Sequence, residues 1–268
     1  MRRIFLVLYG AFIINLLLDC NIIQGISQEK PKFIVKIPSP SDEASYVWNI
    51  INNIQFYTDN KYSLSLPNNE IIDKLIDKKK KGQLTKTDWE MFKTYFANNI
   101  YNEKDYSTAY KKVDSVLETA DIAIDTFEKY KLKWNFFIPE EYTVLLTLYG
   151  AGGTYNAKNG TINLMTTKTG GFKRGANPLE TIIHEAVHIG IENIIVNRFG
   201  LSHWMKERIV DKFVSYHFKK LCPDYTNQPN PDTSIDIILD DPEVWDTLPK
   251  SIELFISNRK STNQSRQK

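Results

Sequence analysis

The segment from Pro178 to Gly200 constrains the fold more than any other, because it is apolar around most of a helix yet carries polar side chains in the middle of its apolar run. Its beginning has the pattern of a capped helix: Asn177 as N-cap, proline at the first helical position, and Glu180 three residues after the cap. Gly200 is a natural end. A helix that is apolar on all sides is buried, and polar groups buried with it need partners.

The polar side chains within the apolar run Ile182–Ile191 are His184, Glu185 and His188, in the order H-E-x-x-H. Two imidazoles four residues apart share one helix face, so their nitrogens can converge on a metal at about 2.0 to 2.1 Å, as tetrahedral zinc requires. Glu185 lies about one residue's rotation from His184 and can reach a water molecule at the metal without being a ligand. The pattern therefore predicts a zinc-dependent hydrolase of peptide bonds, with Glu185 as the general base.

A catalytic zinc site needs a third protein ligand, and the residues that follow discriminate between the known arrangements. The longer pattern H-E-x-x-H-x-x-G-x-x-H is excluded, because Ile194 stands where it requires the third histidine. Glu207 follows His188 after eighteen intervening residues and is the better candidate. Glu192 and His203 are the rival ligands.

Together with Asp211, these residues resemble a known group of enzymes, the glutamate-zincins (gluzincins), a superfamily that includes the thermolysin-like metallopeptidases. The resemblance covers residues 184–211. It implies that His184, His188 and Glu207 are the zinc ligands and that Glu185 is the catalytic base. It also implies that Asp211 holds a ligand imidazole in place, because ligand histidines usually donate their other ring N–H to an oxygen. The Gly-x-Met-Glu-Asn motif of related aminopeptidases is absent, so aminopeptidase specificity is not supported.

A second helix is predicted over residues 203–221, with Ser202 as its N-cap and Glu207 in its second turn. His203 precedes Glu207 by four residues and shares its face. It could therefore hydrogen-bond an oxyanion at the metal, or it could be an ordinary histidine at a helix start beside Trp204.

The rest of the chain predicts an α+β fold: a zincin-like catalytic domain with a small mixed sheet packed on the motif helix, preceded by a helical N-terminal region. Strands are expected at 32–37, 134–138, 142–149 and 160–167, and helices at 41–58, 68–81, 85–99 and 105–131. Residues 161–167 are the candidate edge strand that would hold an extended peptide. The expected regions are 26–104 (N-terminal strand and helices), 105–257 (catalytic domain) and 258–268 (polar tail).

The N-terminus predicts export, to a secreted or periplasmic location. Arg2 and Arg3 precede the apolar run 4–18, as in a secretory signal peptide, which we assign to residues 1–25. Cys20 also resembles a lipid-attachment site, but Asp19 stands where such sites have a small residue, which disfavours a lipid anchor. Removal of the leader would leave Cys222 as the only cysteine, so no intramolecular disulfide is expected, and no transmembrane segment is expected in the mature chain.

The charge balance helps to define the partners. The chain has 34 Lys+Arg and 32 Asp+Glu, a formal net charge of +2, which gives no electrostatic reason to expect nucleic acid or an anionic membrane. A peptide or protein substrate is the expected partner, and the oligomeric state is open. Two alternatives also stay open: a secreted zinc-binding protein with little turnover, and a zinc hydrolase of a non-peptide amide. Intact Glu185 argues against the first, because a structural zinc has no use for a base.

Overall fold

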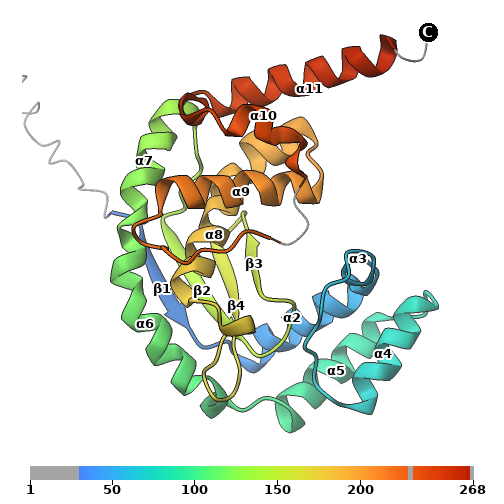
Figure 1. Ribbon diagram of the computed structural model, residues 1–268. Helices are drawn as coiled ribbons and strands as arrows, with labels where there is room; N and C mark the ends of the chain where they lie inside the picture. Colours follow the sequence, from blue (N-terminus) through green and yellow to red (C-terminus); the bar gives the residue numbers. More distant parts are fainter. Residues whose placement is uncertain (1–29, 229–231, 266–268) are drawn as a thin grey trace, which may run out of the picture. The chain divides into compact units, whose positions relative to one another are not determined.

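The computed structural model describes residues 30–228 and 232–265, and residues from Pro31 onward belong to one compact unit. The predicted signal peptide 1–25 and Cys20 lie outside the described residues. Within them the fold is α+β, with helices arranged around a four-stranded mixed sheet (Figure 1), as the sequence predicts. None of the described helices combines the length and the apolar character that crossing a membrane would require.

The sheet has the strand order β1-β2-β4-β3. Its strands are β1 (Lys32–Lys36), β2 (Glu141–Thr147), β3 (Gly153–Asn156) and β4 (Thr161–Met165). β1 and β4 both pair in parallel with β2, whose Val144 lies opposite Val35 and Ile162. β3 is antiparallel to β4 and forms the edge. The alternating buried residues of β2 place the centre of the sheet in the core.

Two strand predictions are wrong. The expected edge strand at 161–167 lies inside the sheet as β4, because the chain turns back between residues 156 and 161 and lays β3 along its outer side. The expected strand at 134–138 is not formed. Trp134 ends α7, Asn135 adopts a left-handed conformation (φ 63°), and Phe136 is buried in an irregular segment. The apolar character of residues 134–138 therefore comes from a loop that packs against the core, and not from a strand.

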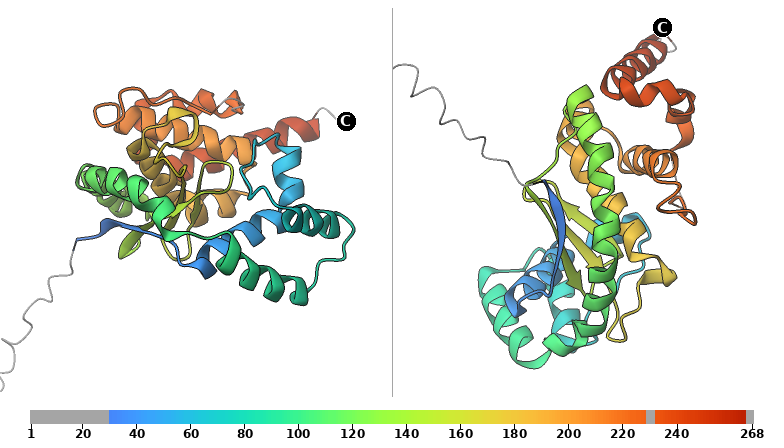
Figure 2. Two further views of the ribbon diagram at one scale, coloured as in Figure 1. Left: turned by 90° about the horizontal axis from the view of Figure 1, so that it is seen from below. Right: turned by 90° about the vertical axis from the view of Figure 1, so that its left-hand side faces the viewer.

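The N-terminal helices follow the predicted positions, but two of them are divided. The helices before the sheet's central strands are α2 (Pro40–Asn52), α3 (Ile54–Asp59), α4 (Glu70–Lys80), α5 (Lys86–Asn99), the short 3-10 helix η2 (Glu103–Tyr106), α6 (Ser107–Asp121) and α7 (Ala123–Trp134). The predicted helix 41–58 is interrupted at Asn53 and the predicted helix 105–131 at Ile122. Figure 2 shows α6 running beside the sheet, where it contacts β1.

The motif segment forms α8 (Pro178–Ile191), which starts at the predicted cap: the Asn177 side chain accepts a hydrogen bond from the Leu179 N–H. α8 packs on β3, β4, α6 and α9. It passes into a π-helix, η4 (Glu192–Asn197), before α9 (His203–His217), which the Ser202 side chain caps. Such π-helical turns occur often at functional sites.

The C-terminal part consists of short helices followed by a long one. They are η5 (Thr233–Ile235), α10 (Asp236–Leu239), η6 (Pro242–Asp246) and α11 (Leu248–Ser265); an earlier 3-10 turn, η3 (Lys173–Gly175), precedes α8. The segment predicted as a polar tail, 258–268, is helical as far as Ser265, because no glycine or proline after Ile256 ends the helix.

Candidate metal centre

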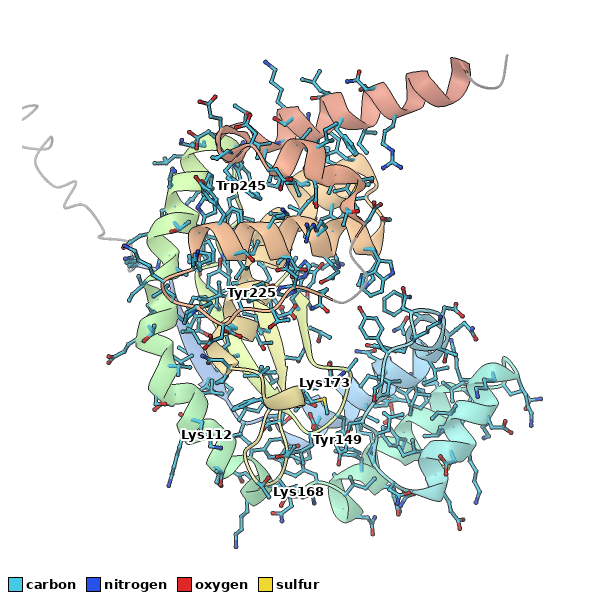
Figure 3. The ribbon with its side chains drawn as sticks, viewed as in Figure 1. Lys112, Tyr149, Lys168, Lys173, Tyr225 and Trp245 are labelled. Atoms are coloured by element: carbon cyan, nitrogen blue, oxygen red, sulfur yellow. The ribbon has the colours of Figure 1, made fainter. Side chains whose placement is uncertain are left out.

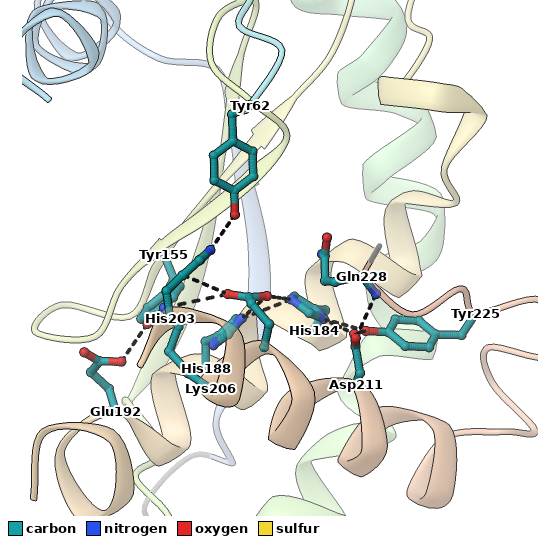
Figure 4. Close-up of polar contacts among 11 residues, drawn as sticks. Tyr62, Tyr155, His184, His188, Glu192, His203, Lys206, Asp211, Tyr225 and Gln228 are labelled. Carbon is teal, nitrogen blue, oxygen red and sulfur yellow. Dashed lines mark hydrogen bonds and ion pairs between the residues drawn. The ribbon is translucent and has the colours of Figure 1, made fainter. Parts of the chain in front are cut away.

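His184 and His188 of α8 meet Glu207 of α9 in a buried group (Figure 4). The two Nε2 atoms are 3.0 Å apart, and each lies 3.3 Å from Oε2 of Glu207. Two ligand atoms held about 2.1 Å from a tetrahedral ion are separated by about 3.4 Å. The spacing of the three donors therefore fits one small metal ion, and the three predicted ligands are brought together.

The surroundings of the group favour a cation. Burial lowers the pKa of His188, so this imidazole is neutral. Burial also acts to lower the pKa of His184, but the carboxylates of Glu207, Glu185 and Asp211 outweigh it and raise that pKa. Glu207 is ionised: burial acts to raise its pKa, and the two histidines hold it well below its usual range. A buried anion facing two imidazole nitrogens is a suitable set of ligands for a divalent ion.

A tyrosine connects His184 to the predicted carboxylate. Nδ1 of His184 lies 2.5 Å from the Tyr225 hydroxyl, which donates to Oδ1 of Asp211 over 2.7 Å. The direct separation of His184 Nδ1 and Asp211 Oδ1 is 3.8 Å, and Oδ2 of Asp211 accepts the Gln228 N–H. Because the Tyr225 hydroxyl donates to Asp211, it accepts the Nδ1–H of His184, and Nε2 is the nitrogen that faces the ligand group.

His188 is held differently. Its ring stacks on that of Tyr155 in β3, with centroids 4.8 Å apart and planes 5° from parallel, while its buried Nδ1 has no hydrogen-bond partner among the described residues. The Tyr155 hydroxyl donates to Glu192 over 2.6 Å and accepts from Lys206 over 3.0 Å. Glu192, a rival ligand in the sequence, therefore lies outside the ligand group and instead fixes Tyr155.

Glu185 lies in the same cavity and is only 6% exposed. Burial raises its pKa to about 7, the range in which a carboxylate can both accept and return a proton at neutral pH. Gly153, the first residue of β3, makes room for it: a Cβ there would lie 2.4 Å from Oε1 of Glu185 and 2.6 Å from Thr181. The edge strand thus approaches the candidate base as closely as a glycine allows.

His203 lies beside the ligand group but does not join it. Its Nδ1 is 3.6 Å from Oε1 of Glu207, and its Nε2 is 2.6 Å from the hydroxyl of Tyr62. Burial lowers the pKa of His203 and raises that of Tyr62, so a neutral imidazole faces a protonated phenol. Sequence reasoning missed Tyr62, which comes from the loop after α3, 141 residues away.

These groups open into one cavity of about 600 Å³. Its walls come from the segments 56–63, 151–155, 164–165, 172–173, 176–188, 203–207 and 225–228, although not every residue of these segments contributes. His217 is not part of the cavity lining; it is half-buried and packs on Tyr130 and Phe213. Cys222 is a buried free thiol.

Comparisons with protein family models, with curated protein sequences and with solved structures found no match. The site is therefore interpreted from its own residues.

Proposed function

We propose that this protein is an exported zinc-dependent metallopeptidase. The observation that carries the proposal is the position of Glu185: a carboxylate that is not a ligand shares a cavity with a group that has three protein ligands among the residues the structure describes. Structural zinc sites are usually closed by four protein ligands, whereas catalytic sites keep a position open for water or substrate. Two imidazoles and one carboxylate are a typical catalytic zinc set, and the resemblance to the gluzincins supports the same assignment.

When bound, zinc would polarise the scissile carbonyl and lower the pKa of water at the site. Glu185 accepts the proton of the water molecule that attacks the carbonyl carbon. As the C–N bond breaks, Glu185 delivers that proton to the leaving nitrogen, so it acts first as base and then as acid.

The pair formed by Tyr62 and His203 would stabilise the negative charge that develops on the carbonyl oxygen. Both side chains line the cavity beside Glu207, and the hydrogen bond between them leaves the pair one polar hydrogen that can be donated to the substrate. Donors fixed in place before the reaction stabilise such a charge without reorganisation. The oxyanion role that the sequence offered for His203 is thus extended to Tyr62.

An extended substrate would lie along β3. This strand is an edge of the sheet, and Gly153, Thr154 and Tyr155 line the cavity beside the ligand group. An edge strand offers main-chain donors and acceptors that can pair with a peptide backbone irrespective of its side chains. This geometry favours a peptide over a small non-peptide amide.

The test compares zinc-loaded wild-type protein with Glu185→Gln on a mixture of peptides, with cleavage followed by mass spectrometry. We expect the variant to lose about 10²- to 10⁴-fold in rate, as for loss of a general base, while its zinc content stays the same. Glu118→Gln, an exposed glutamate of α6 outside the cavity lining, is the control. Equal cleavage by Glu185→Gln would refute the assigned base, and a wild-type protein that binds zinc but cleaves no peptide would support the zinc-binding alternative.

A further inference from the structure

We propose that the cavity contains a subsite for a bulky apolar side chain of the substrate, formed by Phe56, Tyr57, Tyr62 and Trp204, which we call the aromatic wall. The inference rests on the proposed peptidase function and adds the class of residue that the substrate carries beside the cleaved bond. The wall combines two segments far apart in the sequence, α3 with its following loop and the first turn of α9.

The rings of the aromatic wall form a continuous surface. Phe56 and Tyr62 are stacked with centroids 6.1 Å apart, and Tyr62 and Trp204 are stacked at 6.3 Å. Tyr57 meets Phe56 edge to face at 5.5 Å. A further ring stacked on such a surface gains about 0.5 to 1.5 kcal/mol beyond the area that it buries.

The wall lies directly beside the candidate metal centre. His203 packs on Phe56 and Trp204 with centroid distances of 5.5 and 4.7 Å, and its other edge faces Glu207 at 3.6 Å. A peptide whose scissile carbonyl lies at the ligands therefore brings a side chain next to that bond within reach of the wall, since residues of an extended chain are about 3.3 Å apart.

Part of the aromatic wall is exposed to solvent and not buried in the core. None of the six residues of α3 is buried, and Phe56 is 43% exposed while lining the cavity. Clustered aromatic rings at the surface of a cavity are a usual sign of a ligand-binding site.

The segment that carries most of the wall is held in position. Lys173, labelled in Figure 3, donates to the carbonyls of Ser63 and Ala151 and so ties the loop after α3 to the start of β3. Polar side chains, among them Glu180 and Gln228, also line the cavity. The four rings of the wall are therefore a fixed apolar surface within a cavity of mixed character.

The charges beside the wall favour an apolar ligand over a cation, which aromatic rings can also bind. Lys61 belongs to the segment that carries the wall and lines the cavity, whereas Lys206 is paired with Glu207 at 3.8 Å. Lys61 would repel a lysine or arginine of the substrate, and it does not oppose a neutral ring or aliphatic side chain.

The binding test uses the zinc-loaded Glu185→Gln variant, so that no probe is consumed. The probes are three blocked five-residue peptides of glycine and alanine that differ only at the central position, which is Phe, Ala or Lys. We expect the Phe peptide to bind roughly tenfold more tightly than the Ala peptide, or better, by calorimetry. A Lys peptide that binds as tightly as the Phe peptide would overturn the inference.

Substitutions locate the effect. In the same background Phe56→Ser should reduce the preference for Phe over Ala by about two- to tenfold, whereas Phe56→Leu should keep most of it. Met91→Ser removes a 60% exposed apolar side chain from α5, outside the cavity lining, and should change nothing. An undiminished preference in Phe56→Ser would contradict the wall.

Cleavage separates this inference from the proposed function. If wild-type protein cleaves the peptide mixture with no preference for a bulky apolar residue beside the cut bond, the wall fails and the peptidase stands. If wild-type protein cleaves no peptide but the binding preference and its loss in Phe56→Ser are both observed, the peptidase fails and the subsite stands.

Discussion

At the scale of single residues, the two ligand histidines are oriented by different means. His184 is fixed by a hydrogen bond to Tyr225, whereas His188 is fixed by the face of Tyr155. The spacing of H-E-x-x-H predicted where the imidazoles lie, because it depends only on helix geometry. It could not predict the two tyrosines, since one lies in a loop and the other in an edge strand, and neither has a fixed spacing from the motif.

Tyr225→Phe tests the first arrangement. It removes only the hydroxyl that links His184 to Asp211, and loss of such an orienting partner typically costs about 10- to 100-fold in metal affinity. We expect a loss in that range for zinc, measured by competition with a chelator. Tyr216→Phe, a 52% exposed tyrosine on α9, is the control. Unchanged affinity in Tyr225→Phe would mean that Asp211 orients the imidazole without the tyrosine.

At the scale of elements, helix starts were predicted better than helix ends and strand order. The caps at Asn177 and Ser202 are local patterns, and both hold in the structure. The breaks at Asn53 and Ile122 were missed, because the apolar spacing continues across them. The wrong prediction of an edge strand at 161–167 has a similar cause. Periodicity indicates that a segment is a strand, but it does not indicate which strands lie beside it, and here β3 pairs with the outer side of β4.

The close contact of α8 with the loop at Phe136 gives a test at this scale. A Cβ at Gly190 would lie 1.9 Å from the Phe136 ring, so Gly190→Ala forces the ring to move. Overpacking of this kind costs about 1 to 3 kcal/mol. Alanine is about 1 kcal/mol better than glycine within a helix, so a net loss of stability of about 1 kcal/mol is expected in urea unfolding.

The double variant Gly190→Ala with Phe136→Leu provides the control for that prediction. If the ring is the obstacle, the two changes together should cost less than the sum of their separate costs. Strict additivity would show that the strain lies elsewhere in α8.

At the scale of the whole molecule, residues 30–104 contribute to both the site and the core. They supply Tyr62 to the cavity, and they supply Glu43, a buried carboxylate of α2. Its Oε1 accepts hydrogen bonds from Tyr106, Thr147 and the Leu148 N–H, so it joins the N-terminal helices to the end of β2. The α+β class was predictable from the pattern of elements, but this link was not, because Glu43 reads as a helix-surface residue.

Glu43 should make the stability depend on pH. Burial raises its pKa from 4.5 to about 7, so between these values the folded protein holds a proton that the unfolded chain releases. The free energy of unfolding therefore falls as the pH rises from about 4.5 to 7, by about 3 kcal/mol at most. Urea unfolding of wild-type protein and Glu43→Gln across this range measures it. Glu43→Gln should lack this fall in the free energy of unfolding, whereas Glu103→Gln, at an exposed position, should keep it. Parallel pH profiles for wild type and Glu43→Gln would contradict the role assigned to Glu43.

The pairing of β1 with β2 also affects how the chain is made. Lys32 lies opposite Glu141, 109 positions later, so β1 leaves the ribosome well before its partner exists. At about 5 to 20 residues per second this interval is on the order of 5 to 20 s. Throughout it Phe33 and Val35, which the finished protein buries, belong to an unpaired strand that can join the same strand of another nascent chain. The yield of soluble protein should therefore fall when synthesis is slowed between residues 37 and 140, and a chaperone that covers β1 during this interval should restore it.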